Sequence, residues 1–116
     1  MSFENLRAYQ AALLLRAEVD RLRTTLDPIF EALFAHLDDA VDSIMNNLAE
    51  GGESIYPGKQ KLFYDIAAGS AKEARSCLRS LDARGAFRGA NARRAIVLTL
   101  VIGKLIAGLL EALKSR

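Results

Sequence analysis

Cysteine, histidine and proline are scarce in this sequence, and tryptophan is absent. The 116 residues include one cysteine, one histidine and two prolines. A single cysteine excludes an internal disulfide and a multi-cysteine metal site, so we expect Cys77 to be a small, buried core residue. With two prolines and eight glycines, nothing in the composition indicates disorder. A chain of this length is expected to form one domain, residues 1–116, around a single core.

The single histidine, His36, leaves little room for enzymatic chemistry. Four-helix bundles that bind two metal ions use two Glu-x-x-His pairs, and no glutamate lies three residues before His36. Ser70 and Cys77 are seven residues apart and share a helix face, but a nucleophile there would have only His36 as its base. The segment EGGES lacks the lysine and the preceding strand of a phosphate-binding loop. We therefore expect a protein that is not an enzyme and that binds no metal and no cofactor.

The sequence also lacks a hydrophobic run long enough for a membrane span. Its most apolar run, residues 95–110, has 16 residues and contains Lys104, whereas a transmembrane helix needs about 20 apolar residues. We therefore expect a helix that is buried on nearly all sides, and no membrane contact. The polar start of the chain does not resemble a signal peptide, which favours a cytoplasmic location.

Charge is distributed unevenly, although the net charge is only +2. Residues 27–53 contain seven acidic residues and no lysine or arginine, and residues 84–116 contain seven basic residues and one acidic residue. Such polarity can draw subunits together, or it can present one side of the molecule to a polyanion.

Four segments show the three- and four-residue spacing of amphipathic helices, and none shows sustained strand alternation. The expected core stripes of the first two are Ala8, Ala12, Leu15, Val19, Leu22 and Leu26, then Phe30, Leu33, Leu37, Val41, Ile44 and Leu48. Those of the last two are Phe63, Ile66, Ala67, Ser70, Ala74, Cys77, Leu78 and Leu81, then Leu98, Val101, Leu105, Leu109 and Ala112. Short connections favour antiparallel neighbours. The sequence therefore predicts an all-α fold, an antiparallel up-down-up-down four-helix bundle.

Capping and turn residues indicate where these helices begin and end. Asp27 suits an N-cap, and Pro28 suits the first position of the second helix. Gly51 or Gly52 is expected to end that helix in the left-handed conformation, and Pro57 to open the third. The expected breakers of the last loop are Gly85 and Gly89. A very small segment around Gly69 predicts the close approach of another backbone.

A polar stripe runs beside the apolar stripe of the second helix. It consists of Ser43, Asn47 and Glu50, and Ser70 and Glu73 lie three residues apart on the neighbouring third helix. The stripe could be a solvated face, or it could form a structural hydrogen-bond network that fixes how the two helices pair. A carboxylate pair for acid–base catalysis is a third interpretation, which we regard as the weakest.

The segments SIMNNLAEGG and KLFYDIAAGSAKEA together resemble the bacterial four-helix bundle family that includes the 23S rRNA intervening-sequence proteins. The pattern of that family is matched at Ser43, Ile44, Asn47, Ala49, Glu50, Gly51, Ile66, Ala67, Gly69, Ser70 and Glu73. Two positions depart from it, because Leu48 replaces the usual isoleucine and Met45 stands where proline is common. The likeness covers about residues 3–113.

The resemblance implies an up-down-up-down bundle that assembles as a homo-oligomeric ring, often a pentamer. A related branch, the accessory variability determinants of diversity-generating retroelements, forms a basic pentamer that partners a reverse transcriptase and nucleic acid. The resemblance therefore implies the chain itself as a partner, and it adds RNA or DNA and a reverse transcriptase as candidate partners. It favours a structural role for the polar stripe.

Four arginines surround the last loop: Arg84, Arg88, Arg93 and Arg94, with Phe87 among them. Clustered positive charge can contact phosphates, and an aromatic ring can stack on a base. The same arginines could instead pair with the acidic second helix of the same or a neighbouring subunit. Both interpretations stay open at the level of sequence.

The fourth helix is apolar around most of its circumference, so one side is expected to need another subunit as cover. These candidate oligomer-interface residues are Val97, Leu100, Ile102, Ile106, Leu110 and Leu113. The leading hypothesis is a non-enzymatic, nucleic-acid-associated accessory or assembly protein. The alternative is a structural protein-interaction module that binds no nucleic acid.

Overall fold

The computed structural model describes residues 2–115, and this part of the chain is built from helices. It contains four α-helices and two single-turn 3-10 helices, and no strand occurs in it. Their bounds are η1 Phe3–Asn5, α1 Arg7–Arg23, η2 Pro28–Phe30, α2 Glu31–Glu53, α3 Pro57–Ala83 and α4 Arg93–Lys114. The predicted all-α fold with four helices is therefore confirmed.

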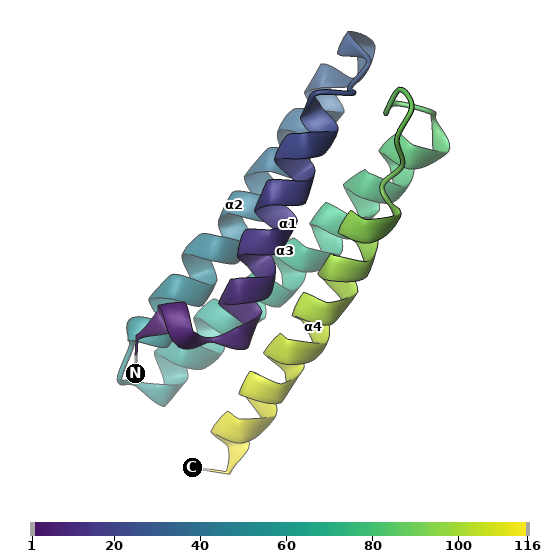
Figure 1. The fold of residues 1–116 in the computed structure, drawn as a ribbon. Coiled ribbons are helices and arrows are strands. Elements are labelled where there is room, and N and C mark those ends of the chain that lie inside the picture. Colours follow the sequence, from purple (N-terminus) through teal and green to yellow (C-terminus); the bar gives the residue numbers. More distant parts are fainter. Residues whose placement is uncertain (1, 116) are drawn as a thin grey trace.

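The four helices lie side by side along a molecule that measures 47 × 20 × 19 Å (Figure 1). Each helix packs along two neighbours, so that α2 contacts α1 and α3, and α4 contacts α3 and α1. The α1–α2 and α3–α4 connections lie at one end of the bundle. The α2–α3 turn lies at the other end, together with the start of α1 and the end of α4.

The core follows the predicted stripes of α1 and α2. The predicted start of the third helix is confirmed, whereas Asp27 and Pro28 begin the 3-10 turn η2, which leads directly into α2 at Glu31. The side chain of Asp27 accepts a hydrogen bond from the Ile29 N–H at 3.2 Å, and Pro28 follows as the first residue of η2. Pro57 is the first residue of α3. The largest fully buried side chains include Leu15, Leu22, Phe34, Leu37, Ile44, Leu48, Leu78, Leu81, Ile102 and Ile106.

The inner face of α3 differs from the predicted one at its start. Tyr64 is buried there, whereas Ile66 is 42% exposed and Phe63 is half-buried. From Tyr64 the buried positions continue through Ala67 and Ala71. Apolar side chains occur on several sides of this first turn, so spacing alone permitted either rotation, and packing against α2 selects the tyrosine.

The core stripe of α4 is rotated from the predicted one. Ile102 and Ile106 are fully buried and Val101 is 40% exposed, the reverse of the expectation. The core also holds Thr99, whose hydroxyl donates a hydrogen bond to the Ile96 carbonyl oxygen at 2.6 Å. Because α4 is apolar on most sides, spacing leaves its rotation undetermined. The prediction that Ile102 and Ile106 belong to an oligomer interface was therefore wrong, since their own chain covers both side chains completely.

Gly51 and Gly52 lie inside α2, which continues to Glu53. Neither glycine has a positive φ. A Cβ atom at position 51 would lie 2.5 Å from Cε1 of Tyr64, and one at position 52 would lie 2.6 Å from Cβ of Phe3. The predicted helix end was therefore wrong. These glycines allow close packing against α2 and do not form a left-handed cap.

We predict that Gly51→Ala destabilises the protein and that Gly108→Ala does not. A methyl group at position 51 would overlap the buried ring of Tyr64, whereas the exposed position 108 has no packing atom within 4 Å. Overpacking costs about 1–3 kcal/mol, and replacing a helical glycine by alanine gains about 1 kcal/mol. Urea titrations measure both free energies of unfolding. A Gly51→Ala variant as stable as the wild type would contradict the packing role of this glycine.

Candidate functional site

The α3–α4 connection begins with a glycine cap. Gly85 has φ +68°, and its N–H donates to the Asp82 carbonyl oxygen at 3.1 Å. The N–H of Ala86 donates to the Leu81 carbonyl oxygen at 3.0 Å. These two bonds form a Schellman motif, which satisfies the last carbonyl groups of α3 and reverses the chain. Gly89 also has φ +68°, so both predicted breakers are confirmed.

Two backbone hydrogen bonds tie this connection to the α1–α2 connection. The N–H of Asp27 donates to the Ala86 carbonyl oxygen at 2.8 Å, and the N–H of Arg88 donates to the Thr25 carbonyl oxygen at 2.8 Å. Because each connection supplies one donor and one acceptor, the two loops fix each other in place. The arginines around the last loop therefore project from an ordered backbone.

Phe87 lies in the core and does not project toward solvent. It is 5% exposed, and its ring packs edge-on against Phe34 with centroids 6.3 Å apart. The predicted stacking of this ring on a base was therefore wrong. The side chain instead anchors the loop to α2, which serves the arginines indirectly by holding their backbone.

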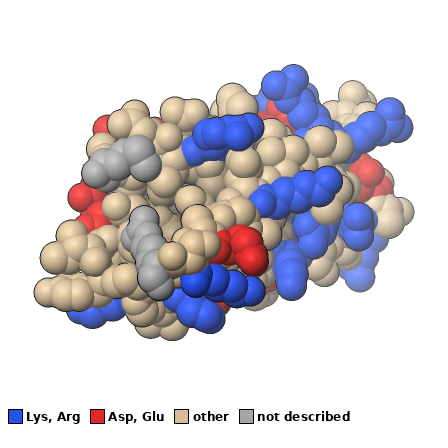
Figure 2. Space-filling model, turned by 90° about the horizontal axis from the view of Figure 1, so that it is seen from below, with Lys and Arg blue, Asp and Glu red and all other residues tan. Residues whose placement is uncertain are grey.

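Arg84, Arg88, Arg93 and Arg94 are all exposed, and we call this end of the bundle the arginine end. Arg88 forms an ion pair with Asp27, with its nitrogen 3.3 Å from the carboxylate oxygen. Arg84 and Arg93 form no ion pair within the described residues 2–115. Figure 2 shows basic side chains gathered on the right of the view, the side where Figure 1 places the α3–α4 connection.

Sequence reasoning missed a further cation, Arg79, near the end of α3. It is exposed, and it forms no ion pair among the residues that the structure describes. It lies well before the loop in sequence, so it was not grouped with the arginines there. Its helical spacing from Arg75, four residues earlier, was the signal that could have revealed a basic α3 face.

The acidic residues of α2 pair mainly with arginines of α1. Arg16 contacts Asp38 at 2.5 Å and Asp42 at 3.1 Å, and Arg23 contacts Glu31 at 3.1 Å and also Asp38. Burial lowers the pKa of Arg16, but the hydrogen bond that Arg16 donates to Asp38 and further acidic contacts outweigh it and raise that pKa. Among the described residues, the only ion pair between the arginine end and the acidic residues 27–53 is therefore the one between Arg88 and Asp27.

The predicted polar stripe is partly assembled into a network between α2 and α3. The hydroxyl oxygens of Ser43 and Ser70 lie 2.7 Å apart. The side-chain amide of Asn47 donates to the Ser43 carbonyl oxygen at 2.8 Å and to its hydroxyl oxygen at 3.2 Å. Glu50 and Glu73 are exposed, and no hydrogen bond joins either one to this network within residues 2–115. The network is therefore smaller than predicted and is made of uncharged groups.

The reactive side chains named from the sequence do not converge. His36 is exposed on α2, and Cys77 is buried on α3, where burial and then the charge of Glu73 raise the pKa of its thiol. A raised pKa keeps the thiol protonated and unreactive at neutral pH. In the part of the chain that the structure describes, no three metal-ligating side chains come together.

One face of α4 is left uncovered by its own chain. Val97 is 50% exposed and Leu100 is 42% exposed, while Leu110 and Leu113 are half-buried. The expectation that the apolar run is too short for a membrane span was wrong, because by length and composition α4 could cross a membrane. Core helices of soluble proteins pass the same test. Only 17% of the most apolar window of α4 is buried in the bundle. Within one chain, the expectation of a helix buried on nearly all sides is therefore not met.

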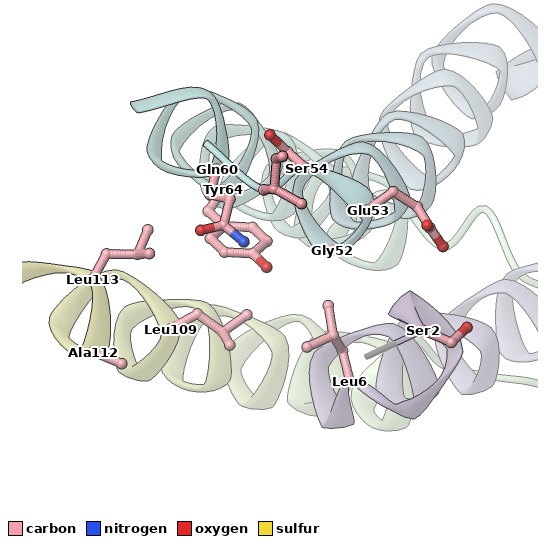
Figure 3. A pocket seen from close by; sticks show the side chains of 11 residues that line it. Ser2, Leu6, Gly52, Glu53, Ser54, Gln60, Tyr64, Leu109, Ala112 and Leu113 are labelled. Carbon is pink, nitrogen blue, oxygen red and sulfur yellow. The ribbon is translucent and has the colours of Figure 1, made fainter. Parts of the chain in front are cut away.

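Sequence reasoning also missed a cleft of about 530 Å³ at the end opposite the arginines. Figure 3 shows Leu6, Tyr64 and Leu109 facing the space between the start of α1, the start of α3 and the end of α4. Glu53 is the one charged residue among the described residues that line it. The cleft arises where the ends of several helices meet, and helical periodicity gives no signal for such a place.

Both halves of the family motif meet across α2 and α3, because Ser43, which accepts from Asn47, contacts Ser70, and Gly51 receives the ring of Tyr64. The fold and this contact define a four-helix bundle whose second and third helices are specified by the motif. The sequence model of the family described as 23S rRNA-intervening sequence protein matches residues 4–108. The chain belongs to this family, as its resemblance predicted. A search of curated proteins found no match.

We predict that Asn47→Ala lowers the free energy of unfolding by about 1–3 kcal/mol, because it removes two hydrogen bonds donated to the half-buried Ser43, each worth about 0.5–1.5 kcal/mol. Asn46→Ala is the matched control, since this exposed asparagine of the same helix lies outside the network and its loss should change stability by about 0.5 kcal/mol or less. Urea midpoints measure both. Equal midpoints for Asn47→Ala and the wild type would mean that the polar stripe is merely solvated.

We also predict that Glu18, which lies beside the arginine end on α1, makes a pH-dependent contribution to the free energy of unfolding. A hydrogen bond from Arg21, at 2.5 Å, lowers the pKa of Glu18 below its ordinary value of 4.5, and the charge of Arg94 adds to this effect. Because folding lowers this pKa, ionised Glu18 stabilises the folded protein fully when the pH is above the ordinary pKa of the carboxyl. The stabilisation is lost as the pH falls through the lowered pKa of the folded state.

Glu18→Gln should therefore unfold at a lower urea concentration than the wild type at pH 7. The gap should narrow as the pH falls below 4.5, the ordinary value for this carboxyl. Urea midpoints over a series of pH values measure the change. A gap that stays constant across the whole series would show that the charge of Glu18 contributes nothing.

Proposed function

We propose that this protein is a non-enzymatic, cytoplasmic accessory or assembly protein. Its up-down-up-down bundles would form a homo-oligomeric ring, a pentamer by family resemblance, and the arginine end would bind the phosphates of RNA or DNA. The related retroelement branch makes a reverse transcriptase a candidate protein partner.

The observation that carries the proposal is the set of exposed, unpaired cations at the arginine end. Arg79, Arg84 and Arg93 form no ion pair within the described residues, whereas Arg16 and Arg23 of α1 form ion pairs with α2. Unpaired arginines on a fixed backbone can contact phosphates without first breaking internal contacts. A ring would repeat the same patch in every subunit and so multiply a modest local charge.

A structural interaction module without nucleic-acid binding is the second candidate, and a specific observation favours it. Residues 1–53 contain four basic and ten acidic residues, whereas residues 54–116 contain twelve basic and four acidic residues. Two halves of opposite charge could attract neighbouring subunits. In that case the cations of the arginine end would face acidic groups of another copy.

We predict that the wild type binds single- or double-stranded RNA or DNA, with an affinity that falls steeply with salt. The triple variant Arg84→Gln, Arg93→Gln and Arg94→Gln should bind more weakly, and its salt slope should flatten by about 0.7–0.9 for each lost phosphate contact. Fluorescence anisotropy of labelled oligonucleotides over a salt series measures both quantities.

The matched control removes three cations at the opposite end of the bundle: Arg7→Gln, Lys59→Gln and Lys61→Gln. It changes the net charge equally, so it should retain most of the affinity if the arginine end is the binding site. Unchanged binding by the first triple variant would place the site elsewhere. No binding by the wild type at low salt would reject the proposal in favour of the structural module.

A further inference from the structure

Helix α3 exposes an apolar line with acidic groups beside it, which we call the ridge: Leu62, Ile66, Gly69 and Glu73. These residues are spaced by four, three and four positions, so they form one line along the helix. Leu62 is 55% exposed and Ile66 is 42% exposed. On α2, Glu50 lies near the start of this line, since it borders the same shallow depression as Leu62.

A second exposed feature, the α3–α4 groove, has a volume of about 370 Å³. Its floor includes the small residues Ala71, Gly103 and Ala107, and Leu100 and Leu110 also line it. Its rim carries three cations: Lys72, Arg75 and Lys104. The ridge and the α3 side of the groove lie about 140° apart around the helix axis, counted at about 100° per residue. They are therefore two distinct surfaces of one subunit.

Packing within the chain does not explain the glycines of these two surfaces. A Cβ atom at Gly69 or at Gly103 would meet no packing atom within 4 Å. The predicted close approach at Gly69 therefore does not occur within the described chain. Each such glycine costs about 1 kcal/mol relative to alanine inside a helix. Close contact with a second molecule would account for this cost.

The charges of the two surfaces are opposite in sign, and they are not paired within the described chain. Glu50 and Glu73 form no ion pair within residues 2–115, and the same holds for the three cations on the groove rim. The ridge carries the large apolar side chains of Leu62 and Ile66. The groove lining combines small residues with Leu100 and Leu110, so it offers an apolar surface to such side chains. Shape and charge therefore match between the two surfaces, whereas two ridges or two grooves would bring like charges together.

We propose that the ridge of one copy docks into the α3–α4 groove of a second copy of this chain. Leu62 and Ile66 then cover the groove floor, and the acidic groups of the ridge face the cations of the rim. The contact is heterologous, so each subunit uses one ridge and one groove, and repetition closes a ring. This inference names the contact behind the proposed ring and assigns Lys72, Arg75 and Lys104 to it, which leaves the arginine end free for nucleic acid.

The test uses one variant for each surface: Ile66→Lys on the ridge and Gly103→Gln in the groove. Position 66 is exposed and position 103 has open space around it, so both variants should fold. We expect light scattering to give a ring for the wild type and a mass near the monomer value of 12.7 kDa for each variant alone. An equimolar mixture should give a dimer of one copy of each and nothing larger, because one intact ridge and one intact groove remain.

Gly108→Gln, at an exposed position of α4 that does not line the groove, is the control and should keep the wild-type mass. A monomeric wild type would overturn the proposal. So would a mixture of the two variants that stays monomeric, or a control that dissociates while Ile66→Lys does not. Mass is measured without nucleic acid, so these outcomes are separate from failure of oligonucleotide binding, which concerns the arginine end alone.

Discussion

The close approach of α2 to α3 is the constraint on which the rest of the structure depends. At one level Ser43 and Ser70 share a hydrogen bond, and two turns further along the ring of Tyr64 sits against Gly51. The first contact requires small hydroxyl side chains, and the second requires no side chain at all on α2. Together they fix the register and the spacing of this helix pair, and α1 and α4 then pack against it.

The parts of the fold that the sequence predicted well are those with one consistent signal. In α2 the apolar stripe is narrow, so its rotation was unambiguous, and Leu37, Val41 and Ile44 are all buried. Asp27 and Pro28 correctly indicated the turn η2 that leads into α2, because their roles depend only on local backbone geometry. The family motif also transferred correctly, since it records contacts between two helices.

The remaining features depend on tertiary contacts that a single helix does not encode. The glycines at positions 51 and 52 resemble a helix end, and only their contacts with Tyr64 of α3 and Phe3 of η1 show that they are packing sites. In α4, apolar residues surround the axis, so the choice of Ile102 over Val101 for the core is made by the neighbours. The arginines of the candidate site were found from composition, but the burial of Phe87 was not, because an aromatic residue among arginines suits either environment.

The paired loops at the arginine end have a consequence for how the molecule opens. Two backbone hydrogen bonds join the α1–α2 and α3–α4 connections there, and Phe87 is buried beneath them. At the opposite end the helix termini surround a cleft. Partial unfolding should begin where such cross-links are fewest, so amide hydrogens near the cleft should exchange with solvent first. The amide hydrogens of Asp27 and Arg88 should be among the slowest to exchange, because they are released only when the α1–α2 pair separates from the α3–α4 pair.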